Sequence, residues 1–173
     1  MIVRTITQAD YHEVDQLIRK AFTSSSYGYG NEAELVQKIR AEKHYQNELE
    51  VVAVEDQQIL GHGLLSDVVI ESKEVDRVGL VLAPLSVLPD CQQRGIGKLI
   101  MSELERRATE LGYPYISILG HPTYYTRFGY TAAKNFGIVP PFEVPDEAFL
   151  IKPLTKDGLK NCEGILRYSQ AFA

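Results

Sequence analysis

The segment Gln92 to Gly97 (QQRGIG) combines residue types and a spacing that suit the binding of an anion. Gly95 and Gly97 lack a Cβ atom, so the main chain can turn sharply and approach a ligand closely. A helix that begins here directs unpaired N–H groups and the positive end of its dipole toward the turn. Arg94 and Lys98 add two positive charges. We therefore predict a cradle for a pyrophosphate. The alternative is that the glycines only permit close packing of a helix on a strand.

The elements on either side of this cradle are predicted to be a strand and a helix. Residues 77–87 form a hydrophobic run typical of a strand. Pro84 within it indicates an edge, a bulge or an opening of the sheet, because proline cannot donate a hydrogen bond to a neighbouring strand. After the cradle, apolar residues recur at helical spacing until Gly112 ends the pattern. The members of this stripe are Ile96, Leu99, Ile100, Leu104, Ala108 and Leu111.

Hydrophobic periodicity predicts that the rest of the chain mixes helices and strands within one domain, residues 1–173. Two segments, 49–54 and 59–70, are typical of a β-hairpin. Thr7 with Asp10, and Asn31 with Glu34, are expected to cap the two N-terminal helices. Further strands are predicted at 2–6, 115–119 and 149–154, and a brief helix at 122–128. The last 20 residues have no clear pattern.

The composition argues against several classes of protein. The net charge is −5 and basic residues do not cluster, so nucleic-acid binding has little electrostatic support. Cys91 and Cys162 lie far apart and the four histidines form no close pair, so no metal site is predicted. No apolar stretch approaches the ~20 residues that cross a bilayer, and no signal peptide is evident. We expect a cytoplasmic protein with reduced thiols that binds neither nucleic acid nor membrane.

Two segments of the chain resemble the motifs of a known superfamily. Gln92-x-x-Gly95-x-Gly97 after a strand resembles the acetyl-CoA signature of the GNAT N-acetyltransferases. About 30 residues later, GHPTYYTRFGY (Gly120 to Tyr130) resembles their second element, and the chain is most similar to the small YhbS-like bacterial branch. The resemblance implies an α/β (α+β) fold with a mixed, mostly antiparallel sheet flanked by helices. In that fold the fourth and fifth strands splay apart, and the pantetheine arm of the cofactor fills the gap.

The resemblance also implies which residues bind acetyl-CoA, the expected cosubstrate, without a metal. A strand end would pair its main chain with pantetheine, and the cradle would hold the pyrophosphate mainly through amide groups. The residues concerned are Leu85, Ser86 and Val87 in the strand, and Gln93, Arg94, Gly95, Ile96, Gly97 and Lys98 in the cradle. Tyr125 matches the tyrosine that protonates the departing thiolate in this superfamily. Without the motif, Tyr125 would be interpreted as a packing residue between helix and sheet.

The implied reaction is direct transfer of an acetyl group from acetyl-CoA to a primary amine of a small molecule or peptide. The general base is left open between His121, Glu32 or Glu34, and a chain of water molecules. Ile118 stands where many relatives carry an asparagine. The lack of an obvious base motivates a second hypothesis, a catalytically silent acyl-CoA-binding or regulatory module. The sequence identifies neither the acceptor nor the oligomeric state, and a homodimer stays open.

Overall fold

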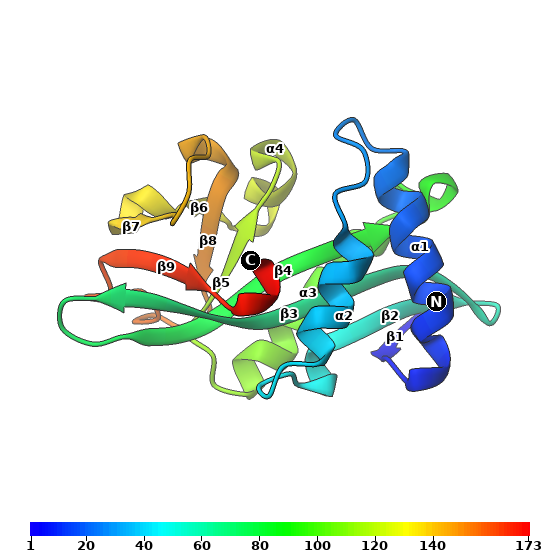
Figure 1. Ribbon diagram of the computed structural model, residues 1–173, viewed down its shortest axis with the longest axis horizontal. Helices are drawn as coiled ribbons and strands as arrows, with labels where there is room; N and C mark the ends of the chain where they lie inside the picture. Colours follow the sequence, from blue (N-terminus) through cyan, green and yellow to red (C-terminus); the bar gives the residue numbers. More distant parts are fainter. The chain divides into compact units, whose positions relative to one another are not determined.

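The computed structural model describes residues 1–173, and Figure 1 labels its helices and strands. Short 3-10 turns join several of them. In chain order the elements are β1 (Ile2–Thr5), α1 (Tyr11–Thr23), α2 (Glu32–Arg40), β2 (Glu50–Glu55), β3 (Gln58–Ser72), β4 (Arg77–Val87), α3 (Ile96–Glu110), β5 (Tyr115–Leu119), α4 (Pro122–Tyr125), β6 (Thr131–Ala132), β7 (Ile138–Val139), β8 (Phe149–Pro153) and β9 (Gly164–Tyr168). None of the helices is both long enough and apolar enough to span a bilayer.

The chain forms two compact units. The first comprises Met1–Ser66 and Ala83–Arg107, and the second comprises Asp67–Leu82 and Ala108–Ala173. The long strands β3 and β4 therefore each contribute one end to each unit, as does the helix α3. Hydrogen bonding connects the strands in the order β1-β2-β3-β4-β5-β8-β6, with β9 on β3 and β7 on β9.

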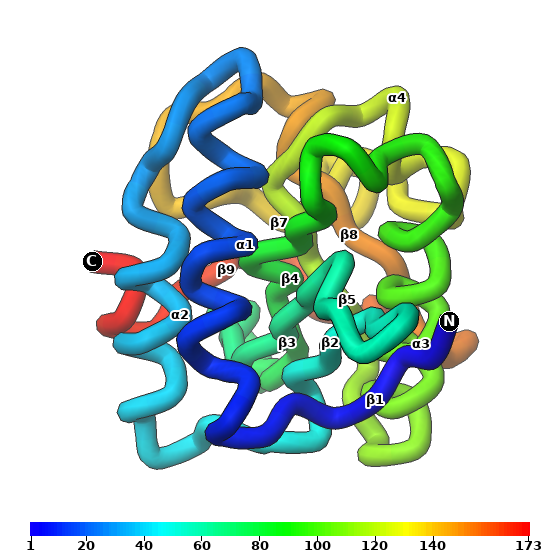
Figure 2. The backbone as a smooth tube through the Cα atoms, turned by 90° about the vertical axis from the view of Figure 1, so that its right-hand side faces the viewer, coloured from blue at the N-terminus to red at the C-terminus, as the bar shows by residue number.

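In the first unit, β1, β2 and the beginning of β3 run antiparallel, with Ile2 opposite Val54 and Glu50 opposite Leu64. Figure 2 shows α1 and α2 on one side of these strands and α3 on the other. The apolar faces of the helices turn toward the strands, which is why the helical sequence pattern exists. Buried members of this core include Leu17, Ile18, Val36, Ile39, Leu64, Ile100 and Leu104.

The helix α3 packs against bare main chain on β3. A Cβ atom added to Gly63 would lie 2.6 Å from Ile100 Cγ2, and one added to Gly61 would lie 2.8 Å from Ile100 Cδ1. Contacts this short do not occur between real atoms, so a larger residue at either position would displace the side chains of α3 that pack there. The close approach fixes where the first turn of α3 lies relative to β3.

In the second unit, β5 pairs with β4 in parallel at Leu80–Ile116 and Val81–Ser117, and these two residue pairs are the whole parallel ladder. β8 lies antiparallel to β5 and carries the short β6 on its other edge. β9 pairs antiparallel with the far end of β3 and parallel with β7. The buried side chains of this unit include Tyr115, Phe149, Ile151 and Leu166.

Most predicted elements are present, and the capping box is confirmed. The strand 77–87 and the hairpin of β2 and β3 match the expected segments. The Thr7 amide donates to Asp10 Oδ2 at 2.8 Å in the box predicted before α1. The cap expected of Asn31 is wrong. Asn31 has a left-handed φ of 68° and its side chain caps nothing, while Glu32 accepts the Gly30 amide at 2.8 Å.

The stripe predicted for α3 is correct for four of its six members. Leu99 is 48% exposed and Leu111 is 47% exposed, whereas the other four are buried. Leu99 lies outside the buried face of α3. That face extends around the helix in the other direction, to Gly97 and Met101. Leu111 follows the last residue of α3, so helical spacing no longer determines its direction.

Candidate functional site

The end of β4 supplies the three strand residues predicted to bind the cofactor. Ser86 is 2% exposed and its hydroxyl has no protein partner, while Leu85 and Val87 are half-buried. The Gln92 side-chain amide donates to the Val87 carbonyl at 3.4 Å, which ties the cradle to the strand end. The sequence motif includes Gln92, but this tie was not predicted, because its acceptor is a main-chain atom that no residue type reveals.

The cradle between β4 and α3 has the backbone geometry that glycine allows. Gly95 has a φ of 80° and Gln93 a φ of 64°, both in the left-handed region. A Cβ atom on Gly95 would meet nothing within 4 Å, so its glycine is needed for conformation rather than for space.

The first turn of α3 leaves its amide groups available to a ligand. The first helical bond joins the Leu99 amide to the Gly95 carbonyl at 3.1 Å. The N–H groups of Ile96, Gly97 and Lys98 precede that bond and therefore have no partner within the helix. Ile96 and Gly97 are buried, whereas the side chain of Lys98 is exposed. The turn can thus bind an anion through main-chain donors.

The charge expected from Arg94 is partly neutralised. Its Nη2 atom lies 2.9 Å from Glu55 Oε2 on β2, and both side chains are exposed. The hydrogen bond from Arg94 holds the pKa of Glu55 below its usual value. A pair this exposed is weak, so Arg94 can leave it for a phosphate group. Lys98 lies on the exposed side of the same turn.

In the second unit, Tyr125 ends α4 with its ring edge-on to two other tyrosines. The ring centroids lie 4.9 Å from Tyr124 and 6.3 Å from Tyr130. Burial raises the pKa of Tyr125 well above its ordinary value, so the phenol stays protonated and can act as a proton donor. A Cβ atom on Gly120 would lie 2.5 Å from Tyr125 Cε2, so this glycine makes room for the ring. Gly120 opens the second motif, but its steric role was not predicted.

The side chains proposed as a base already have protein partners. His121 is exposed, and its Nδ1 atom lies 2.8 Å from the Thr123 hydroxyl. Glu34 accepts a short hydrogen bond from Tyr29 and lies 3.2 Å from Arg19. The Tyr29 bond, supported by the Arg19 charge, lowers the pKa of Glu34 and makes it a weaker base. No three His, Cys, Asp or Glu side chains lie together as ligands for a metal ion.

Comparison with known proteins identifies the family. A model of the acetyltransferase (GNAT) domain matches residues 34–132, more than half of the chain. The chain belongs to the GNAT acetyltransferase family. The matched GNAT segment runs from α2 to β6 and contains both the cradle and Tyr125.

Full-length relatives have the same fold. This GNAT protein is 28% identical to the uncharacterized N-acetyltransferase YhbS of Escherichia coli K12, over 99% of this chain and 98% of YhbS. A crystal structure of YhbS in complex with CoA matches with a TM-score of 0.87 and 27% identity, covering 99% of this chain and 91% of that one. A GNAT family acetyltransferase from Brucella melitensis, in complex with acetyl-CoA, matches with a TM-score of 0.80 and 30% identity, covering 99% and 97%. The predicted GNAT fold is confirmed: a mixed, mostly antiparallel sheet with parallel β4 and β5, flanked by helices.

Proposed function

We propose that this GNAT protein transfers an acetyl group from acetyl-CoA to a primary amine. The observation that carries the proposal is the left-handed turn at Gln93 and Gly95, which leaves three main-chain donors at the start of α3 just beyond the end of β4. Support also comes from two similar proteins whose crystal structures are complexes with CoA or acetyl-CoA.

The cofactor would be bound by main-chain groups along this stretch. The amides of Ile96, Gly97 and Lys98 suit the pyrophosphate, and the Arg94 and Lys98 side chains add charge-assisted bonds. The main chain of residues 85–87 would pair with the amides of pantetheine, as an edge strand pairs with a peptide. The amide of Val87 would then polarise the thioester carbonyl as a single-donor oxyanion site.

The transfer itself needs two proton movements. The attacking nitrogen forms a bond to the thioester carbon and loses a proton, and the carbon–sulfur bond breaks with its electron pair on sulfur. Tyr125 would donate its phenolic proton to that sulfur, and its phenolate would regain a proton from solvent. The raised pKa of Tyr125 supports this role, because the group stays protonated until it is used. General-acid help of this kind contributes about 10²–10⁴-fold to the rate.

A second candidate is a silent module that binds acyl-CoA without transferring the acyl group. The observation that favours it is that Glu32, Glu34 and His121 all have partners within their own segments. In that case the cradle would serve recognition alone, and Tyr125 would only fill space beside Gly120.

Calorimetry and a thiol-release assay separate the two candidates. The protein would be titrated with acetyl-CoA and then assayed with spermidine, lysine, kanamycin and a peptide with a free N-terminus. Saturable binding together with acceptor-dependent release of CoA thiol is expected for the transferase. Binding without release would favour the silent module, and no binding at millimolar acetyl-CoA would contradict both.

A further inference from the structure

Three buried polar atoms in the first unit have no hydrogen-bond partner in the protein: His62 Nδ1, Ser66 Oγ and Ser86 Oγ. His62 is 0% exposed and Ser86 is 2% exposed. Buried polar atoms are nearly always paired with protein, ordered water or a ligand, because an unpaired one costs about 1–3 kcal/mol. We therefore expect each of these three atoms to have a partner from outside the chain, such as water or a ligand.

His62 and Ser86 lie on the same side of neighbouring strands. Gly61 and Gly63 face α3, so His62 between them faces the opposite side. Leu85 Cδ1 reaches the α3 side, 3.7 Å from a Cβ atom placed on Gly63, so the next residue, Ser86, also faces away from α3. The Ser86 carbonyl would lie 3.2 Å from a Cβ atom on Gly61, the residue before His62. Ser86 on β4 therefore lies beside this part of β3.

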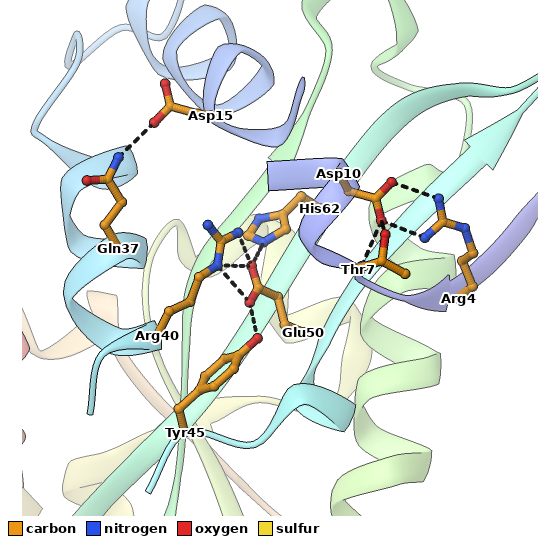
Figure 3. Close-up of polar contacts among 9 residues, drawn as sticks. All are labelled: Arg4, Thr7, Asp10, Asp15, Gln37, Arg40, Tyr45, Glu50 and His62. Atoms are coloured by element: carbon orange, nitrogen blue, oxygen red, sulfur yellow. Dashed lines mark hydrogen bonds and ion pairs between the residues drawn. The ribbon is translucent and has the colours of Figure 1, made fainter. Parts of the chain in front are cut away.

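The other ring nitrogen of His62 is held by a buried carboxylate. Figure 3 shows Glu50 surrounded by His62, Arg40 and Tyr45. His62 Nε2 lies 2.8 Å from Glu50 Oε1, Arg40 Nη2 lies 2.5 Å from the same atom, and the Tyr45 hydroxyl donates to Oε2 at 2.5 Å. Burial alone would raise the pKa of Glu50, but the bonds from His62 and Arg40 lower it to about 2.

These contacts determine which nitrogen of His62 carries the proton. An ionised carboxylate only accepts hydrogen bonds, so Nε2 must be the donor and, in the neutral ring, Nδ1 keeps its lone pair. Glu50 on β2 is the group bonded to the ring, and its other partners are Arg40 on α2 and Tyr45 between α2 and β2. The Arg40 guanidinium carbon lies 3.7 Å from the ring centroid of Tyr11 on α1. The Arg40 charge balances that of Glu50, and burial raises the pKa of Tyr45 above its usual range, so it stays a donor.

We propose that His62 is the terminal proton acceptor for acetyl transfer, reached from the attacking amine through Ser86 Oγ and buried water. The proposal rests on the proposed function. The amine nitrogen gives its proton to water bound at Ser86, a second proton moves from water to His62 Nδ1, and the resulting imidazolium is stabilised by Glu50. After product release His62 returns this proton to solvent. The relay offers a base other than His121, Glu32 and Glu34, whose side chains have protein partners, and it uses Ser86 on the strand proposed to hold pantetheine.

The test compares three variants under saturating acetyl-CoA and the best amine of the panel. His62→Gln keeps an amide donor toward Glu50 but has no basic nitrogen, and Ser86→Ala removes the hydroxyl. Ser66→Ala is the matched control, because it removes another unpartnered hydroxyl two side-chain positions beyond His62 on the same face of β3. At pH 7 we expect kcat to fall about 10²-fold for His62→Gln and about 10-fold for Ser86→Ala. Ser66→Ala should stay near the wild-type value.

The pH dependence separates a proton acceptor from a structural residue. As the pH approaches the pKa of the free amine, the nucleophile loses its proton in solution and the deficit of His62→Gln should shrink. A structural role of His62 would give a loss that is independent of pH. If the wild-type protein acetylates the amine and His62→Gln has the same kcat, the relay is overturned and the proposed function stands. A wild-type protein that binds acetyl-CoA but acetylates no amine would overturn both.

A measurement on the wild-type protein covers the case in which His62→Gln does not fold. Nitrogen-15 NMR of histidine-labelled protein reports which ring nitrogen is protonated. The relay requires a neutral His62 with hydrogen on Nε2 and a bare Nδ1 near pH 8. A proton fixed on Nδ1 at that pH would overturn the proposal.

Discussion

The cradle at the start of α3 and the segment around α4 differ in the groups that they offer to a ligand. The cradle offers main-chain amides, and its key residues are defined by backbone conformation at Gln93 and Gly95. The α4 segment offers one side chain, Tyr125, and its key neighbour is defined by the space that Gly120 leaves. Glycine therefore has two distinct uses here: Gly95 allows a left-handed backbone, and Gly120 leaves space for a side chain. We expect changes in the cradle to alter cofactor affinity and changes near α4 to alter turnover.

Among changes in these two regions, the largest effect is expected from Tyr125→Phe. Removal of the phenolic proton should lower kcat by about 10²-fold, the lower end of general-acid contributions, while the Kd for CoA stays near the wild-type value. Because burial raises the pKa of Tyr125, ionisation of the phenol should cause no loss of wild-type rate between pH 8 and 10. Steady-state kinetics and calorimetry measure the two quantities. Unchanged turnover would reduce Tyr125 to a packing residue.

Gly120→Ala provides an independent check on the same ring. The added methyl group would meet Tyr125 Cε2, so the ring must move while its hydroxyl remains. Turnover should fall by about 10-fold, less than for Tyr125→Phe. A fall in CoA affinity instead of turnover would remove the proposed division between the two regions.

An intermediate effect is expected from Gly95→Ala, with Gly112→Ala as the matched control. The two glycines flank α3, both have a φ between 80° and 86°, and neither would bring a Cβ atom within 4 Å of another residue. Each alanine should therefore cost about 1–2 kcal/mol of backbone strain. Only Gly95 belongs to the cradle, so only its variant should weaken CoA binding, by about 5–30-fold if the turn relaxes. Equal affinities for the two variants would contradict the cradle.

The smallest effect is expected from Glu55→Gln. Removal of this carboxylate frees Arg94 from its ion pair and should tighten CoA binding by about two-fold at low salt. Because both groups are exposed, the difference should disappear near 0.5 M salt, where charges are screened over a few ångströms. Weaker binding by the variant would show that Glu55 positions Arg94 instead of competing for it.

Local sequence patterns predicted most helices and strands and the glycine turn of the cradle. They did not predict contacts between segments that are distant in the sequence. The strand 77–87, the glycine turn and the helix after it are encoded within about 35 consecutive residues, so the sequence revealed them. Glu50 was not singled out, since a glutamate at a strand end suggests solvent. Its partners Arg40 and His62 lie 10 and 12 positions away. The pairing of β2 with β3 brings His62 close, and the packing of α2 on the strands brings Arg40.

Three other parts of the chain show the same limit. Asn31 has the residue type of a helix cap but a left-handed backbone, so its side chain cannot reach the amides it was expected to bind. The last 20 residues gave no pattern because β9 is short and pairs with Val68–Ser72, almost a hundred positions earlier. Tyr125 could be located by motif alone, but its need for Gly120 depends on the side-chain packing that the fold creates.

The bare surface of β3 beneath α3 has a consequence for how this protein could change over evolution. Gly61 and Gly63 belong to no proposed ligand site, yet a side chain added at either position would press on Ile100, so this residue or the start of α3 must move. Mutational scans that score only ligand contacts would overlook both positions. We expect substitutions there to lower cofactor affinity, although the direct change is in the distance between α3 and β3.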